Sequence, residues 1–167
     1  MTTHHPVELK APDISRYAKG TDGVPYVHTF DSGKPGPHVM VNALTHGNEI
    51  CGAIALETIF SLGLKPKQGK MTLGFINVGA FQRFDPAKPN ASRFVDEDFN
   101  RVWGLDVLEG SRDSVETRRA RALRPVVDAA DYLLDIHSMQ HPTAPLMLCG
   151  PLAKGRTWAR RIGFPEM

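Results

Sequence analysis

Cysteine is scarce in this 167-residue chain: only Cys51 and Cys149 occur, far apart and without the C-x-x-C spacing of thiolate metal sites. Two isolated cysteines argue against a disulfide scaffold and fit a protein of a reducing compartment. The sequence also lacks any apolar run near the roughly 20 residues of a membrane span, and its first residues contain no apolar signal core. These absences predict a cytoplasmic protein with no membrane partner.

A strong charge of either sign is also absent, because 20 basic and 18 acidic residues leave a formal net charge of +2. The basic excess comes largely from residues 118–124 and 159–161, short runs that are typical of solvated helix faces. Basic and aromatic residues are not interleaved, so no nucleic-acid partner is predicted. Internal repeats and low-complexity tracts are missing, and the 41% hydrophobic content supports a single core.

The sequence does contain short apolar runs, and several have the length of a strand that is buried on both faces of a sheet. The predicted strands of this kind are residues 38–44, 71–78, 131–137 and 145–149. An earlier segment, residues 24–30, is rich in β-forming residues and ends at the turn-forming D-S-G-K-P-G-P.

Helical spacing of apolar residues separates these runs. The predicted helices are residues 50–60, 114–130 and 152–162. Asn48 is a candidate N-cap of the first helix, and Pro125 marks a kink or a break in the second. Residues 82–110 form a long excursion, and long structured loops in compact domains are often functional. Strands alternating with helices predict an α/β fold whose sheet is mostly parallel, or mixed, and flanked by helices.

Two of the predicted strands end in turns that contain histidine, T-H-G-N-E and L-D-I-H-S. In parallel α/β sheets, ligands bind beyond the carboxyl ends of the strands. His46 and Glu49, three residues apart, can face a common point, and His137 is placed to complete a three-residue set such as a catalytic zinc takes. A polar helix start capped by Asn48, beside an unrelated structural histidine, is the alternative, and spacing alone leaves both open.

Other polar residues near these turns have weaker signals. Asp135 lies two residues before His137 on the same strand face, so it is a candidate to orient a ligand. His141 is close in sequence but falls in a predicted loop. The remaining histidines are interpreted as structural or surface residues: His4, His5, His28 and His38.

The excursion carries a second candidate group in S-R-F-V-D-E-D-F-N-R. Arg93, Asn100 and Arg101 offer donors that suit a substrate carboxylate, and a guanidinium beside a metal can stabilise an oxyanion. The alternative is a surface network that joins the arginines to the neighbouring acidic residues 96–98.

The ordered set T-H-G-N-E, S-R-F-V-D-E-D-F-N-R and L-D-I-H-S resembles the succinylglutamate desuccinylase/aspartoacylase family, a branch of the zinc carboxypeptidase superfamily. The resemblance implies that His46, Glu49 and His137 bind one Zn²⁺ per chain. It implies that Arg93 polarises the scissile carbonyl, and that Asn100 with Arg101 holds the free carboxylate of the substrate.

The reaction implied is hydrolysis, by metal-activated water, of the amide bond of a small-molecule N-acyl amino acid. Two alternatives stay open: a zinc carboxypeptidase that acts on peptides, and a non-catalytic domain that binds a metal or a carboxylate. The same ligand and arginine sets would serve either enzyme.

One element of the family pattern is missing after the third ligand. The general-base glutamate has no match, because Glu166 is the only acidic residue after His137 and stands in the wrong context. We therefore expect an extended lead-in with one strand (residues 1–36) and the N-terminal part of a zinc hydrolase catalytic domain (residues 37–167), incomplete at its C-terminus. Such a chain, a fragment or a natural truncation, is expected to bind zinc and hydrolyse poorly unless self-association or a second polypeptide completes it.

Overall fold

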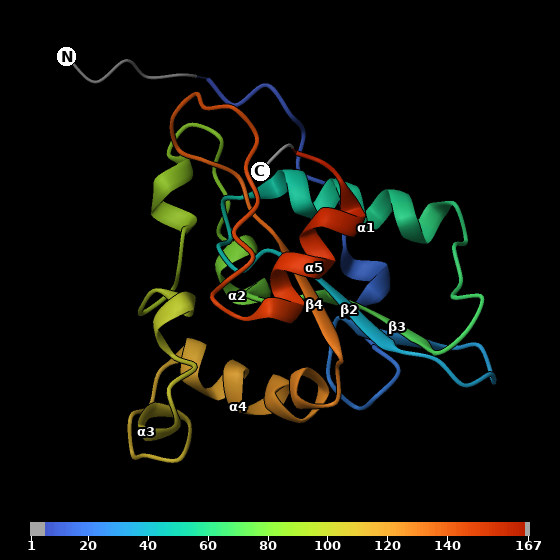
Figure 1. The fold of residues 1–167 in the computed structure, drawn as a ribbon. Helices are drawn as coiled ribbons and strands as arrows, with labels where there is room; N and C mark the ends of the chain where they lie inside the picture. The colour runs from blue at the N-terminus through green and yellow to red at the C-terminus, as the bar shows by residue number, and fades with distance from the viewer. Residues whose placement is uncertain (1–5, 166–167) are drawn as a thin grey trace.

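A computed structural model describes residues 6–165, and its centre is a four-stranded sheet (Figure 1). The strands are β1 (Val27–Asp31), β2 (His38–Ala43), β3 (Lys70–Phe75) and β4 (Tyr132–Ile136). They lie side by side in the order β1-β3-β2-β4. β1 runs antiparallel to β3, whereas β2 runs parallel to both of its neighbours. The predicted mostly parallel, mixed sheet is confirmed.

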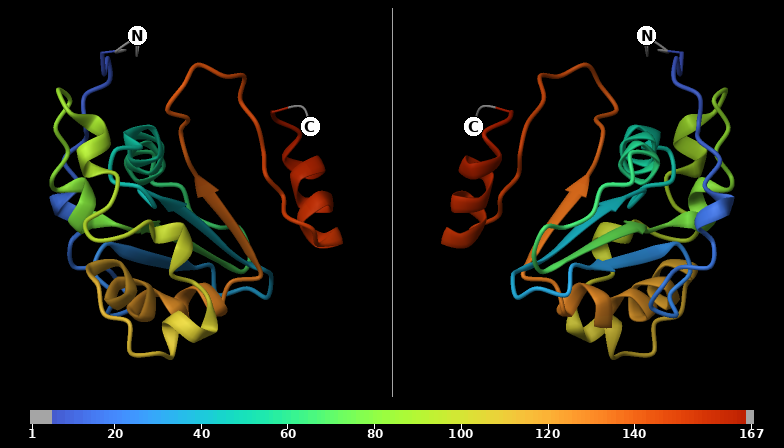
Figure 2. Two further views of the ribbon diagram at one scale, coloured as in Figure 1. Left: turned by 90° about the vertical axis from the view of Figure 1, so that its left-hand side faces the viewer. Right: turned by 90° about the vertical axis from the view of Figure 1, so that its right-hand side faces the viewer.

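Helices cover both faces of this sheet. The α-helices are α1 (Ile50–Ser61), α2 (Val78–Phe81), α3 (Leu105–Leu108), α4 (Val115–Asp128) and α5 (Ala153–Ile162), and the 3-10 helices are η1 (Ser15–Tyr17), η2 (Pro89–Ser92) and η3 (Phe99–Arg101). Figure 2 shows α1 on one side of the sheet and α4 on the other. α5 lies beside β4, where Trp158 stacks on Tyr132 with ring centroids 4.4 Å apart. Between residues 6 and 165, no helix combines the length and the hydropathy that a membrane crossing needs.

Two clusters of buried side chains join these layers. Leu56 and Phe75 belong to the cluster on the α1 side, and Met40 and Leu123 to the cluster on the α4 side. The second cluster also contains Phe99, a fully buried residue of the long excursion. The excursion is therefore not a free loop, because its short helices are anchored in the core.

Helix α4 begins at a well-formed cap and continues through its proline. Ser114 and Thr117 form a capping box, in which each side chain hydrogen-bonds the backbone N–H of the other. The sequence predicted a kink or a break at Pro125; Pro125 lies inside the helix, so the break does not occur. Pro125 is exposed and removes one backbone hydrogen bond near the end of the helix, while Val126 and Val127 pack against the core. That packing stabilises the last turn.

The predicted strand at residues 145–149 is also wrong. The chain after His137 leaves the sheet and arches away from it (Figure 2), and residues 145–149 have no regular structure. Leu148 is 90% exposed. The apolar pattern indicates a preference for burial, but a strand also needs a neighbour for its backbone hydrogen bonds, and among the described residues this segment pairs with none.

The lead-in contributes to the same sheet as the rest of the chain. Its described part, from Pro6 onward, contains η1 and β1, and β1 pairs with β3. Three residues that were interpreted above lie outside the described residues: His4, His5 and Glu166.

Candidate metal centre

The candidate site forms at the carboxyl ends of β2 and β4, which are neighbouring parallel strands. Directly after β2, Leu44 has a backbone φ of 62°, a conformation that residues with large side chains rarely adopt. Leu44 is fully buried, and its carbonyl oxygen accepts a hydrogen bond of 2.8 Å from the backbone N–H of Asn77. This turn directs residues 45–49 across the edge of the sheet.

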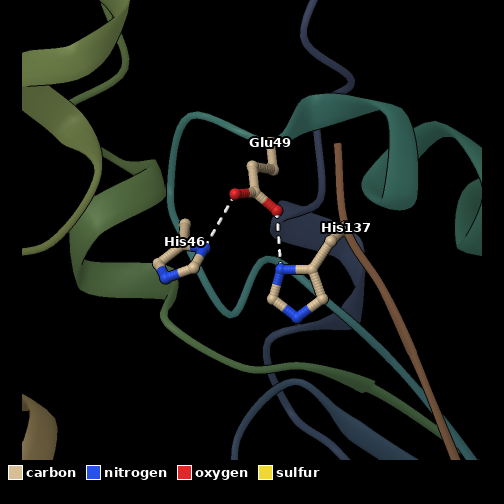
Figure 3. A group of neighbouring side chains, drawn as sticks. All are labelled: His46, Glu49 and His137. Carbon is tan, nitrogen blue, oxygen red and sulfur yellow. Dashed lines mark hydrogen bonds and ion pairs between the residues drawn. The ribbon is translucent and has the colours of Figure 1, made fainter. Parts of the chain in front are cut away.

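The three predicted ligands converge at this edge, as Figure 3 shows. His46 Nδ1 lies 2.7 Å from one carboxylate oxygen of Glu49, and His137 Nδ1 lies 2.8 Å from the other. One donor atom from each residue falls within 4.8 Å of the other two. His46 and Glu49 are buried, whereas the His137 side chain is 34% exposed. The cluster is thus open on the His137 side.

A second carboxylate backs each histidine on its far side. Asp135 Oδ2 lies 2.8 Å from His137 Nε2, and Asp98 Oδ1 lies 3.1 Å from His46 Nε2. The Thr45 hydroxyl contacts both Asp135 oxygens at 2.9 Å. At His137, the Asp135 carboxylate on Nε2 favours the tautomer that carries its proton there, which leaves the Nδ1 lone pair free for a metal.

The mutual contacts set the charges of the cluster. Burial alone would raise the pKa of Glu49, but hydrogen bonds with His137 and His46 outweigh it and lower this pKa to about 2. Hydrogen bonds with Asp135, then with Glu49, raise the pKa of His137 to about 10. Without a metal, His137 is therefore a cation held between two carboxylates at neutral pH. A metal cation bound at Nδ1 would take the place of that proton.

The donor set suits zinc. Two imidazole nitrogens and one carboxylate are ligands that a hydrolytic Zn²⁺ commonly takes, with a position left for water. Mg²⁺ and Ca²⁺ prefer oxygen ligands alone. Histidines whose other nitrogen contacts a carboxylate are the usual arrangement at such centres. His46, Glu49 and His137 thus fit a zinc ion on the chemistry of their own contacts.

The excursion brings Arg93 to the cluster. The guanidinium of Arg93 donates to Glu49 Oε1 at 3.1 Å, and its second terminal nitrogen lies 3.0 Å from His46 Nε2. The backbone carbonyl of Arg93 accepts a hydrogen bond of 3.0 Å from the N–H of Gly47. Backbone and side chain of Arg93 therefore both contact the T-H-G-N-E turn.

Asn100 and Arg101 differ from each other in placement. The Asn100 amide nitrogen lies 3.4 Å from His46 Nε2, at the edge of the cluster. Arg101 is exposed, and its guanidinium donates to the carbonyl oxygen of Asn100 at 3.4 Å. The structure thus brings Arg93 and Asn100 to the candidate ligands and leaves the Arg101 side chain in solvent.

Sequence reasoning missed Asp98 as a partner of the histidines. It placed the acidic residues 96–98 in an alternative surface network with the arginines, and Arg93 does lie 3.8 Å from Asp98. The contact from Asp98 to His46 joins residues 52 positions apart, which no local spacing predicts. The proposed N-cap was wrong as well, because α1 has Glu49, not Asn48, at its N-cap and lacks a side-chain capping bond there.

The remaining described histidines have ordinary surroundings. His28 Nε2 lies 2.9 Å from the carbonyl oxygen of Tyr17, and His38 Nε2 lies 2.7 Å from the Thr72 hydroxyl. These contacts agree with their interpretation as structural or surface residues. His141 is exposed and does not belong to the three-residue cluster.

Comparison with known proteins shows the family to which this chain belongs. Residues 35–151 match the profile of the succinylglutamate desuccinylase/aspartoacylase catalytic domain, so the chain belongs to this family. The crystal structure of an aspartoacylase family protein from Mesorhizobium loti is similar, with a TM-score of 0.62 and 25% identity, over 88% of this chain and 46% of that protein. Comparison with curated protein sequences gave no match.

Two further solved structures share the fold. One is the succinylglutamate desuccinylase from Chromobacterium violaceum, with a TM-score of 0.52 and 18% identity over 68% of this chain and 36% of that one. The other is the product-bound ectoine utilization protein from Ruegeria pomeroyi, with a TM-score of 0.50 and 20% identity over 69% and 33%. The chain spans less than half the length of each of these relatives.

Proposed function

We propose that this chain carries the metal-binding half of a deacylase site, in which one Zn²⁺ per chain is held by His46, Glu49 and His137. The reaction is hydrolysis of the amide bond of a small-molecule N-acyl amino acid. One observation supports this most: two imidazole nitrogens and a carboxylate converge at neighbouring strand ends, and each imidazole is backed by a second carboxylate. All of these residues lie within the region that matches the family.

Arg93 is the residue that we assign to the scissile carbonyl. Zinc, when bound, would polarise that carbonyl and make hydroxide available near neutral pH. The Arg93 guanidinium already faces His46 and Glu49, and it is always charged, so its N–H groups can donate to an oxygen that gains negative charge beside the ligands.

Asn100 and Arg101 are assigned to the free carboxylate of the substrate. Both follow Asp98 on the same short helix η3, next to the cluster. Arg101 is exposed, so its guanidinium can turn toward a carboxylate and bind it with two parallel hydrogen bonds. Its role stays a prediction from the family pattern.

We assign no described residue to proton removal from the attacking water. Asp98 and Asp135 each contact a histidine, and Glu49 is itself a candidate ligand. A positioned base contributes roughly 10²–10⁴ in rate. We therefore expect the chain alone to bind zinc but to hydrolyse its substrate poorly.

The test combines metal content with hydrolysis. We expect one zinc per purified chain by elemental analysis, and its loss in His46→Ala and His137→Ala. His141→Ala is the matched control, because it removes an exposed histidine four residues from His137 and should keep the metal. A chain that binds no zinc, or that binds it equally well after His46→Ala, contradicts the proposal.

A substrate panel separates the competing activities. Release of free amine is measured for N-acetyl and N-succinyl amino acids and for short peptides. Preference for the N-acyl amino acids supports the deacylase, and preference for peptides indicates a carboxypeptidase. Bound zinc with ligand binding but no turnover of either class favours a non-catalytic binding domain.

A further inference from the structure

Glu116 is a buried acidic residue outside the candidate ligands. It is the second residue of α4, and its exposure to solvent is 0%. Its oxygens accept four hydrogen bonds: Oε1 from Val95 N (2.6 Å) and Asn77 Nδ2 (3.0 Å), and Oε2 from Asp96 N (3.0 Å) and Glu97 N (3.3 Å). Three of these donors are consecutive backbone amides of the excursion.

These three amides lie in the middle of the segment that supplies the site. Arg93 precedes them, and Asp98 and Asn100 follow. On one side the segment is held where Gly47 donates to the Arg93 carbonyl, and on the other side by the buried ring of Phe99. Between these two points the side chain of Phe94 is 38% exposed, and the Glu97 carboxylate forms an ion pair with Arg112. Contacts with α4, together with this ion pair, therefore hold the middle part.

The contact with α4 runs in both directions. Glu116 of the helix accepts from the segment, and Asp96 of the segment accepts a hydrogen bond of 2.8 Å from the first helical amide, Val115 N. Asn77, two residues after the end of β3, also takes part: its side chain caps α2 and donates a hydrogen bond to Glu116. A buried carboxylate is costly unless donors satisfy it, and here four do. An apolar residue would fill the space without holding the loop.

We propose that Glu116 is a positioning residue of the site: it fixes the backbone of residues 95–97 so that Arg93 and Asp98 reach His46 and Asn100 faces the substrate. The part that concerns the substrate rests on the proposed function. Glu116 touches neither the metal position nor the ligand, and it acts through the loop.

Glu116→Gln tests this with nearly the same side-chain volume. In glutamine an NH₂ group replaces one of the two carboxylate oxygens. This NH₂ group would face two N–H donors and cannot accept a hydrogen bond from either of them. We expect amide hydrogen exchange of a peptide covering residues 94–98 to rise about tenfold or more, while peptides of β2 stay protected. One zinc per chain is still bound, and the affinity of the zinc-loaded chain for N-acetyl-L-glutamate falls about tenfold.

Two further variants keep the result interpretable. Asp113→Asn removes an exposed acid at the same helix end, whose carboxylate pairs with Arg118 and with no other residue between 6 and 165, and it should match the wild type. Asp96→Ala breaks the reciprocal contact from an exposed position, and it should raise exchange in the same peptide to a smaller extent. If Glu116→Gln does not fold, the exchange rate of this peptide in Asp96→Ala decides whether contacts with α4 hold the loop.

Unchanged exchange at residues 94–98 in both loop-contact variants would overturn the proposal. So would faster exchange with undiminished affinity for N-acetyl-L-glutamate. If the wild-type chain binds neither zinc nor this ligand, the proposed function fails instead. The comparison of amide hydrogen exchange between the wild type and the variants needs neither zinc nor N-acetyl-L-glutamate. It then decides on its own whether Glu116 holds the loop.

Discussion

His46 and His137 each lie between Glu49 and a second carboxylate, which is Asp98 for the first and Asp135 for the second. In the metal-free chain this arrangement favours a proton on His137, whose pKa rises to about 10. The same nitrogen would bind the metal. Proton and metal therefore compete for one atom over the whole neutral range.

Zinc affinity should accordingly fall with decreasing pH. With the pKa of Glu49 near 2 and that of His137 near 10, Glu49 is already ionised at neutral pH and His137 gives up one proton when zinc binds. The apparent affinity should then fall about tenfold for each pH unit between 8 and 6. Competition with a chromophoric chelator at several pH values measures this slope.

Asp135→Asn provides the check on this prediction. It removes the contact that contributes most to the raised pKa of His137, so the pH dependence should flatten at the upper end of the range. Asp128→Asn, an exposed change on α4, should leave the slope unaltered. An equally steep slope in Asp135→Asn and the wild type would rule out this origin of the pH dependence.

At the residue scale, the sequence predicts the site where local geometry determines it. The three-residue spacing of His46 and Glu49, and the shared strand face of Asp135 and His137, follow from short-range rules. The contacts of Asp98 and Glu116 depend on how a long excursion folds back over the sheet. Nothing local in the sequence determines that path.

Among the structural elements, the turn after β2 packs closely against two other backbone segments at Gly47. A Cβ atom on Gly47 would lie 2.4 Å from both the Ala80 backbone carbon and the Ser92 carbonyl oxygen. The glycine is therefore needed for close approach of three backbone segments, and the motif T-H-G-N-E has a packing reason for its third residue.

Gly47→Ala should destabilise the chain by about 1–3 kcal/mol, because the overlap involves backbone atoms that cannot move independently. It should also weaken zinc binding, since His46 and Glu49 flank this position. Urea unfolding and a zinc titration measure the two effects. Gly79→Ala is the control, because its Cβ would find only ordinary contacts at 3.5 Å or more and an alanine suits a helix. Equal stability of the two variants would contradict the packing argument.

Long periodic elements were predicted well, and short or unpaired ones were not. α4 has an extended amphipathic pattern, α1 is a largely apolar helix, and β2 and β3 are apolar runs at the centre of the sheet. β4 was predicted as a strand, but its predicted burial on both faces was wrong, because β4 lies at the edge of the described sheet and Leu133 is 47% exposed. α2 spans four residues and depends on the Asn77 cap, too few residues for a period to appear. Residues 145–149 have a strand pattern, but within residues 6–165 no strand lies beside them.

Considered as a whole, the molecule would be cross-linked by a metal at this site. His46 and Glu49 follow β2, whereas His137 follows β4, 88 positions after Glu49. A metal that binds all three holds together two strands that are distant in sequence. Binding to the folded state alone then adds to the free energy of unfolding.

Zinc removal should therefore lower the thermal stability of the chain. At free zinc about 100 times the dissociation constant, the stabilisation is about 2.7 kcal/mol, which corresponds to several degrees in melting temperature. Thermal denaturation with and without a chelator measures it. His137→Ala should abolish the difference, and His141→Ala should retain it. A chelator effect that persists in His137→Ala would show that the metal acts elsewhere.

The lateral order of the strands was beyond sequence reasoning. Apolar runs indicate that strands are buried and, through alternation with helices, that most are parallel. They do not specify neighbours, so nothing predicted that β2 would separate β3 from β4. That adjacency is what brings His46 and His137 together, and it depends on how α1 and α4 pack on opposite faces.

The positive φ of Leu44 leaves this fold with a trade-off that no single amino acid resolves. Glycine would relieve the backbone at this position but would give up a fully buried side chain, whereas any large apolar residue keeps the burial and the strain together. The strained backbone at Leu44 lowers the stability of the chain, but it also sets the direction of the turn that carries His46 and Glu49. Stabilising substitutions are therefore better sought far from this turn, where local stability and the geometry of the site are not opposed.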